Sequence, residues 1–177
     1  MIMRRKIGYL IIVAFAAVAC SKTTPVPLTA AEQLAYEITV IDAYLAKNGI
    51  EAVKLESGVR YTIVEMGTGP TPTIDNCVRF RYNGYPLYND TARFDSNNTD
   101  GLKAALVKLV AGVQIGMKLM PVGTKGTIYI PSALAYPSGI YDSYNQVQTL
   151  NPNEPIGFEV EILQLYAYNS LGNYCYE

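Results

Sequence analysis

Residues 78–84 read Val78-Arg79-Phe80-Arg81-Tyr82-Asn83-Gly84, and their side chains alternate between apolar and polar up to the glycine. The same alternation recurs over residues 59–63 and 156–162, where Val, Ile, Tyr and Phe alternate with mostly charged or polar residues. A period of two is typical of a β-strand with one buried and one solvated face. These stretches therefore predict a half-buried antiparallel sheet.

A helix is predicted ahead of these strands, over residues 30–47. Thr29 and Glu32 have the spacing of a capping box, and Asn48-Gly49 supplies a stop. The apolar residues between them recur at helical spacing: Leu34, Ile38, Ile41 and Leu45. A stripe of four residues is short for a coiled coil with a second copy, so we expect it to pack on the domain that follows. A second, short helix is predicted over residues 113–119.

Residues 1–19 have the pattern of an export signal. Three basic residues, Arg4, Arg5 and Lys6, precede an apolar run over residues 7–19. The run is shorter than the roughly 20 residues of a transmembrane helix. Small residues directly before Cys20 resemble a bacterial lipoprotein box, in which that cysteine is acylated. The usual Leu three places earlier is Ala17 here, so an ordinary signal peptide with an incidental Cys20 is the alternative.

The remaining chain divides into four predicted parts. Residues 20–28 contain the lipidated cysteine and a flexible tether with two prolines, and residues 29–50 form the N-terminal helix. Residues 51–168 form one domain, and residues 169–177 form a C-terminal tail. We therefore expect an exported, membrane-anchored protein of the periplasm or cell envelope.

The composition excludes several classes of function. Removal of residues 1–19 leaves 11 basic residues against 15 acidic ones, so nucleic acid is not an expected partner. The chain has no histidine, which excludes Ser-His-Asp and Cys-His catalysis and histidine-bound zinc. We expect neither a metal nor a cofactor. An oxidising compartment permits a disulfide between Cys77 and Cys175, although two separate buried thiols remain the alternative.

From Ser57 to Tyr166 the chain resembles the FKBP family of peptidyl-prolyl isomerases. The resemblance rests on the order and spacing of five motifs: Val78 to Gly84, Arg93-Phe94-Asp95-Ser96, Met120-Pro121-Val122-Gly123, Ile130 to Tyr136, and Phe158 to Leu163. It implies an α+β fold, with a strongly curved antiparallel sheet wrapped around a short helix. The N-terminal helix is an addition to that fold. Proline-containing polypeptides are the implied partners.

The resemblance also implies a set of site residues. Five of them match positions that surround the proline ring: Tyr82, Phe94, Val110, Tyr136 and Phe158. The backbone amide of Val110 and the hydroxyl of Tyr136 match groups that hold the substrate's carbonyls. Asp95 matches a buried acid at the pocket edge, while Leu109, Val113 and Leu150 match substrate-binding positions.

Other interpretations of these residues remain open from the sequence. Tyr82, Phe94 and Phe158 would also suit ordinary core packing, and Asp95 would suit a structural buttress. The family usually has Trp where this chain has Val113, which favours reduced activity. A catalytically weak FKBP-like module that binds a protein partner through residues 141–148 is therefore the alternative function.

Overall fold

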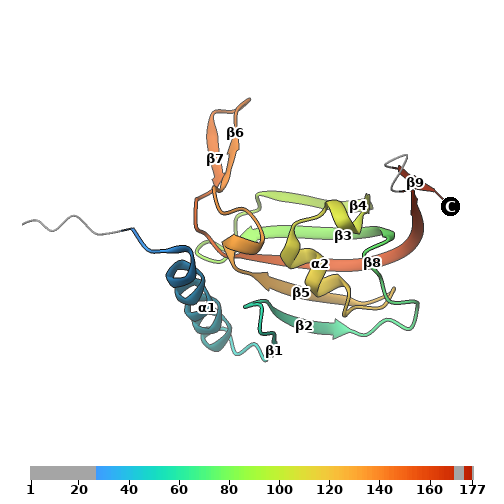
Figure 1. Ribbon diagram of the computed structural model, residues 1–177, viewed down its shortest axis with the longest axis horizontal. Helices are drawn as coiled ribbons and strands as arrows, with labels where there is room; N and C mark the ends of the chain where they lie inside the picture. The colour runs from blue at the N-terminus through green and yellow to red at the C-terminus, as the bar shows by residue number, and fades with distance from the viewer. Residues whose placement is uncertain (1–26, 170–173, 177) are drawn as a thin grey trace, which may run out of the picture.

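The computed structural model describes residues 27–169 and 174–176. Its elements are two α-helices, two short 3-10 helices and nine strands, which Figure 1 shows as one sheet, a separate hairpin and the helices around them. In chain order they are α1 (Ala30–Lys47), β1 (Val53–Lys54), β2 (Arg60–Glu65), β3 (Asn76–Pro86), β4 (Asp95–Ala105), η1 (Leu106–Lys108), α2 (Ala111–Met117), β5 (Lys125–Ile130), η2 (Ser132–Leu134), β6 (Ile140–Asp142), β7 (Val147–Leu150), β8 (Ile156–Asn169) and β9 (Tyr174–Tyr176).

The main sheet is antiparallel and has the strand order β1-β2-β5-β8-β3-β4, with β9 paired to the end of β8. The central strand β8 pairs with β5 on one side and with β3 on the other. Strands β6 and β7 form a separate hairpin that stands clear of the sheet (Figure 1). The α+β fold predicted from the sequence is confirmed.

Helix α2 lies on the inner face of the sheet because two of its residues are glycines. A Cβ atom on Gly112 would lie 2.1 Å from Cγ2 of Ile130, and one on Gly116 would lie 2.4 Å from Cδ1 of Ile128. Such contacts are far below van der Waals distance, so only glycine permits this close approach. Fifteen buried residues form the core on this face, among them Phe80, Val113 and Ile162.

Helix α1 occupies the predicted residues and packs against the outer face of the same sheet. Its capping box is formed, since Thr29 accepts from the Glu32 amide and the Glu32 carboxylate accepts from Thr29. Ile41 and Leu45 are buried in a second cluster with Tyr85, Leu87 and Tyr129. The expected packing on the domain is thereby realised.

Two further predictions concern the ends of the chain. The signal peptide, Cys20 and most of the tether lie outside the described residues. Within the described part, no helix is long and apolar enough to span a bilayer. Cys77 and Cys175 form a disulfide with a Cα–Cα distance of 5.7 Å, which resolves the choice that the sequence left open.

Candidate proline-binding site

A cavity of about 270 Å³ opens between the inner face of the sheet and the start of α2. Seven predicted site residues line it: Tyr82, Asp95, Leu109, Val110, Val113, Tyr136 and Phe158. Binding cavities of small molecules measure roughly 300 to 1,000 Å³, so this one is sized for a small side chain. The rings do not fill the space between them.

One wall of the cavity consists of stacked aromatic rings on neighbouring strands. Tyr82 on β3 and Phe158 on β8 stack with their centroids 5.1 Å apart and an interplanar angle of 17°. Phe80 packs beside Tyr82, with the two ring centroids 5.5 Å apart. All three side chains point inward because they occupy the apolar positions of the alternating pattern.

Phe94 is not among the residues that line the cavity. Its ring covers Gly84, where a Cβ atom would lie 2.5 Å from the ring carbon Cζ. The edge of the Phe94 ring also meets Tyr136, with centroids 5.8 Å apart and planes at 74°. Phe94 therefore contacts Tyr136, which does line the cavity.

Asp95 is exposed, whereas the resemblance implied a buried acid. The difference arises because Asp95 begins β4, the edge strand of the sheet, which has a neighbour only on its β3 side. The hydroxyl of Tyr82 donates to Oδ2 of Asp95 at 2.8 Å. Burial raises the pKa of Tyr82, and the hydrogen bond to Asp95 raises it further. Tyr82 therefore remains a neutral donor at physiological pH.

Tyr136 follows η2 and lines the cavity. Its backbone carbonyl accepts from Gly139 at 2.9 Å, which closes a turn directly after it. Burial raises the pKa of Tyr136, so the hydroxyl stays protonated. Within residues 27–169 and 174–176, no hydrogen bond satisfies this hydroxyl. It is available to donate to a bound carbonyl.

The segment before α2 supplies a second available donor. Val110 is the N-cap of α2, and its carbonyl accepts from the amides of Val113 and Gln114. The Gln114 side chain donates to the Leu109 carbonyl at 2.7 Å and fixes this segment. The amide of Val110 itself donates to none of the described residues.

Val113 and Leu150 occupy different depths. Val113 is 2% exposed and forms part of the floor of the cavity. Leu150 is 1% exposed and belongs to the core, where it does not line the cavity. Its predicted role as a wall of the site stays a prediction.

Three lining residues were missed from the sequence: Phe80, Leu102 and Lys108. Phe80 had a clear signal, since it lies two residues before Tyr82 in the same alternating stretch. Leu102 belongs to the part of β4 for which the sequence offered no confident match with the family. Lys108 is exposed at the rim, and nothing in its local sequence distinguishes it from other surface lysines.

The site combines apolar walls with a few fixed polar groups. Across the described residues, no cluster of three or more Cys, Asp or Glu side chains is arranged to hold a metal. The chain also has no histidine to transfer a proton. The arrangement suits a reaction that needs shelter from water and oriented hydrogen-bond donors.

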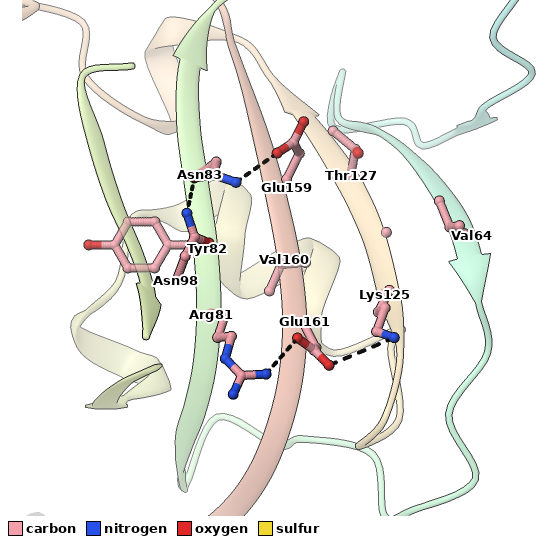
Figure 2. Close-up of a pocket in the computed structure, with 11 residues that line it drawn as sticks. Val64, Arg81, Tyr82, Asn83, Asn98, Lys125, Thr127, Glu159, Val160 and Glu161 are labelled. Atoms are coloured by element: carbon pink, nitrogen blue, oxygen red, sulfur yellow. Dashed lines mark hydrogen bonds and ion pairs between the residues drawn. The ribbon is translucent and has the colours of Figure 1, made fainter. Parts of the chain in front are cut away.

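A second hollow, of about 310 Å³, lies on the outer face of the sheet. Figure 2 shows that its charged side chains are paired: Arg81 and Lys125 both contact Glu161, and Asn83 donates to Glu159. Tyr82 is the one aromatic residue in its lining, and the ring of Tyr82 belongs to the inner wall; paired charges, amides and aliphatic residues make up the rest. This hollow is therefore not suited to hold a proline ring.

The fold and the inner cavity together define a class: a curved antiparallel sheet that closes an aromatic pocket over a short helix. Comparison with known proteins agrees, because the profile of the FKBP-type peptidyl-prolyl cis-trans isomerase family matches residues 69–163. The chain belongs to the FKBP-type peptidyl-prolyl cis-trans isomerase family.

Several relatives have names of this class. The chain is 34% identical to the FKBP-type peptidyl-prolyl cis-trans isomerase FkpA of Aeromonas hydrophila over 128 residues, which cover 70% of this chain and 45% of the relative. It is 29% identical to the outer membrane protein MIP of Legionella longbeachae over 129 residues, covering 70% and 52%. The chain thus spans about half the length of these relatives.

The solved structures give the same fold. A peptidyl-prolyl cis-trans isomerase from Pseudomonas syringae superposes with a TM-score of 0.62 and 27% identity, covering 80% of this chain and 98% of the other. FkpA from Escherichia coli gives a TM-score of 0.60 and 25% identity, covering 76% and 63%.

Proposed function

We propose that the chain is an exported, lipid-anchored FKBP-type peptidyl-prolyl cis-trans isomerase that assists the folding of envelope proteins. The open aromatic cavity of about 270 Å³ is the observation that supports the activity most strongly. It lies beside two donors, the Val110 amide and the Tyr136 hydroxyl. Its proposed substrates are polypeptides that contain proline.

The physical basis is the lost polarity of a twisted amide. Rotation about the bond before proline breaks amide resonance, and the barrier is roughly 18 to 20 kcal/mol. The twisted state has less charge separation than the planar one, so water stabilises it less. An apolar cavity that excludes water therefore favours the twisted state over the ground state. Each 1.4 kcal/mol of that preference increases the rate about tenfold.

Each site residue then has a proposed role. Tyr82 and Phe158 shelter the proline ring, with Phe94 supporting the wall and Leu109 and Val113 completing it. The Val110 amide and the Tyr136 hydroxyl hold the carbonyls of the substrate. Asp95 fixes the hydroxyl of Tyr82, and Leu150 supports the floor. Because Val113 is smaller than the tryptophan usual in the family, we expect lower activity than the family norm.

The location is proposed from the sequence. Residues 1–19 direct export, Cys20 carries the lipid, and residues 20–28 tether the helix of residues 29–50 and the domain of residues 51–168; residues 169–177 form the tail. The name of the Legionella relative, outer membrane protein MIP, agrees with an envelope location for that protein. The disulfide agrees with an oxidising compartment for this chain.

The test is the cis-to-trans turnover of a short proline peptide by the full chain in mild detergent. We expect turnover clearly above that in detergent buffer alone. Glu161→Gln, a change in the outer hollow, serves as the matched control and is expected to leave turnover unchanged. A rate equal to the uncatalysed one would contradict the proposal and leave the weak or inactive binding module.

A further inference from the structure

One buried carboxylate takes no part in the cavity. Glu37 lies on α1 and is fully buried, although its neighbours in sequence suggested only an apolar stripe. Three donors satisfy it: the Ser132 amide at 2.5 Å, the Ser132 hydroxyl at 2.6 Å and the Gln33 side chain at 2.7 Å. A buried carboxylate is tolerated only with such partners, so this contact is specific.

Ser132 connects that carboxylate to the cavity. It is the first residue of η2, and the Glu37 carboxylate satisfies its backbone amide. Within η2 the Leu134 amide donates to Pro131 at 3.0 Å, and the Ala135 amide donates to Ser132 at 2.9 Å. Tyr136 follows directly. Glu37 thus holds the beginning of a short, hydrogen-bonded segment whose end carries the Tyr136 side chain.

Helix α1 is itself fixed to the sheet, so the position of the Glu37 carboxylate is fixed as well. Ile41 is fully buried against the outer face, and Asp42 makes an ion pair with the buried Arg60 at 2.9 Å. The Tyr44 hydroxyl also donates to Asp90 at 3.0 Å. The helix therefore offers a rigid mount rather than a loose arm.

We propose that Glu37 is a positioning residue for the isomerase site, which acts through Ser132 and η2 to hold Tyr136 at the cavity. The inference rests on the proposed function, because the role of Tyr136 belongs to it. It makes the N-terminal helix part of the site's support, although α1 lies on the opposite face of the sheet from the cavity.

The main test compares three variants of the full chain at a temperature where all are folded. Glu37→Leu removes the acceptor of the Ser132 amide. It is expected to lower kcat/KM about three- to tenfold, which is the range expected when the hydrogen bond from Tyr136 to the substrate is lost. Glu37→Gln is expected to restore most of the turnover, because its carbonyl accepts from the Ser132 amide and its amide donates to the Ser132 hydroxyl and, once the Gln33 amide group has flipped, to the Gln33 side-chain oxygen. Cys175→Ser removes the disulfide, which lies outside α1 and outside the cavity lining, and is expected to lower the melting temperature while turnover stays within about twofold.

A double-mutant cycle tests whether the effect passes through Tyr136. In the Tyr136→Phe background, Glu37→Leu is expected to lower turnover less than it does in the parent chain. Equal losses in both backgrounds would overturn the inference, as would an equal loss of turnover in Cys175→Ser.

A second readout needs no activity. In NMR spectra of ring-labelled tyrosine, the Tyr136 signal is assigned by its absence in Tyr136→Phe. Glu37→Leu is expected to shift that signal, and Glu37→Gln and Cys175→Ser are expected to leave it in place. An unshifted signal in Glu37→Leu overturns the inference. If Glu37→Leu does not fold, Ser132→Ala replaces it and is expected to shift the same signal. A parent chain without turnover overturns the proposed function, and the ring signal then decides about Glu37 alone.

Discussion

Tyr82 and Tyr136 both border the inner cavity, but their hydroxyl groups have different tasks. The Tyr82 hydroxyl is already occupied, since it donates to Asp95 at 2.8 Å. The Tyr136 hydroxyl has no hydrogen-bond partner among the described residues, and Tyr136 lines the cavity. Removing the hydrogen bond between Tyr82 and Asp95 should loosen the aromatic wall of the cavity. Removing the Tyr136 hydroxyl should abolish a hydrogen bond that is made only with substrate.

Tyr136→Phe tests the second task. The variant keeps the ring and its contact with Phe94, so the free energy of unfolding should stay nearly unchanged. Turnover should fall about three- to tenfold, because one hydrogen bond to the substrate is lost. Tyr141→Phe is the matched control, since that ring is exposed on the hairpin and lies outside the cavity lining. Equal turnover in Tyr136→Phe and the parent would contradict the assigned role.

Asp95→Leu tests the first task, which is the hydrogen bond from the Tyr82 hydroxyl to Asp95. Because Asp95 is exposed, its loss should change the melting temperature little, whereas the freed Tyr82 ring should lower turnover about three- to tenfold. Asp100→Leu, also exposed on β4, is the control and should retain turnover. Both are compared by peptide turnover and thermal unfolding. If Asp95→Leu unfolds while activity per folded molecule is intact, Asp95 is a structural buttress only.

The sequence predicted residues of the site where side-chain direction follows from a local pattern. Tyr82 and Phe158 lie in stretches of strict alternation, so their inward direction was determined locally. The exposure of Asp95 was not determined by the local sequence, because it depends on which strand borders β4 across the sheet. The burial of Leu150 in the core was not determined locally either, because whether a residue of β7 lines a cavity or packs in the core is set by tertiary contacts.

At the scale of elements, α1 shows both the strength and the limit of pattern reasoning. Its bounds followed from the capping box and the stop, and the burial of Ile41 and Leu45 followed from their spacing. The burial of Glu37 could not be predicted, since the donors that satisfy it include Ser132, 95 residues further along the chain. Local sequence carries no record of such a partner.

The attachment of α1 gives a prediction that depends on pH. The hydrogen bond from Arg60 holds the pKa of Asp42 below its usual range, and Lys54 adds to the effect. A lowered folded-state pKa stabilises the fold fully above the unfolded pKa of about 4, and this stabilisation is lost as the pH falls through the folded value.

Asp42→Asn should therefore lower the free energy of unfolding by about 1 to 2 kcal/mol at pH 7. The difference between variant and parent should shrink as the pH falls below about 4, where the parent's carboxylate becomes protonated. Urea unfolding at pH 7 and pH 3 measures it. Asp100→Asn is the control, because Asp100 is exposed and its carboxylate has no hydrogen bond or ion pair with the described residues. A difference that is the same at both pH values would contradict the role of the Asp42 charge.

At the scale of the whole molecule, the two faces of the sheet have different structural roles. The inner face and α2 enclose the cavity, while the outer face carries α1 and paired charges (Figures 1 and 2). The disulfide joins the start of β3 to β9, and Ala105 and Tyr166 pack around it. It therefore ties the C-terminal strand to the sheet.

Cys175→Ser tests this tie. The bridge closes 98 residues of chain, so its loss should lower the free energy of unfolding by about 2 to 4 kcal/mol. Turnover of the folded protein should persist, because neither cysteine lines the cavity. Denaturant unfolding with and without reductant measures the effect. The parent should lose stability in reductant and the variant should not; a parent insensitive to reductant would contradict the prediction.

The central claim is that the inner cavity holds the proline ring, and intermolecular NOEs from a bound proline peptide test it most directly. We predict NOEs from the proline ring protons to the rings of Tyr82 and Phe158 and to the Val113 methyl groups. NOEs confined to Tyr141 and Tyr144 on the exposed hairpin, with none to the cavity, would contradict the account.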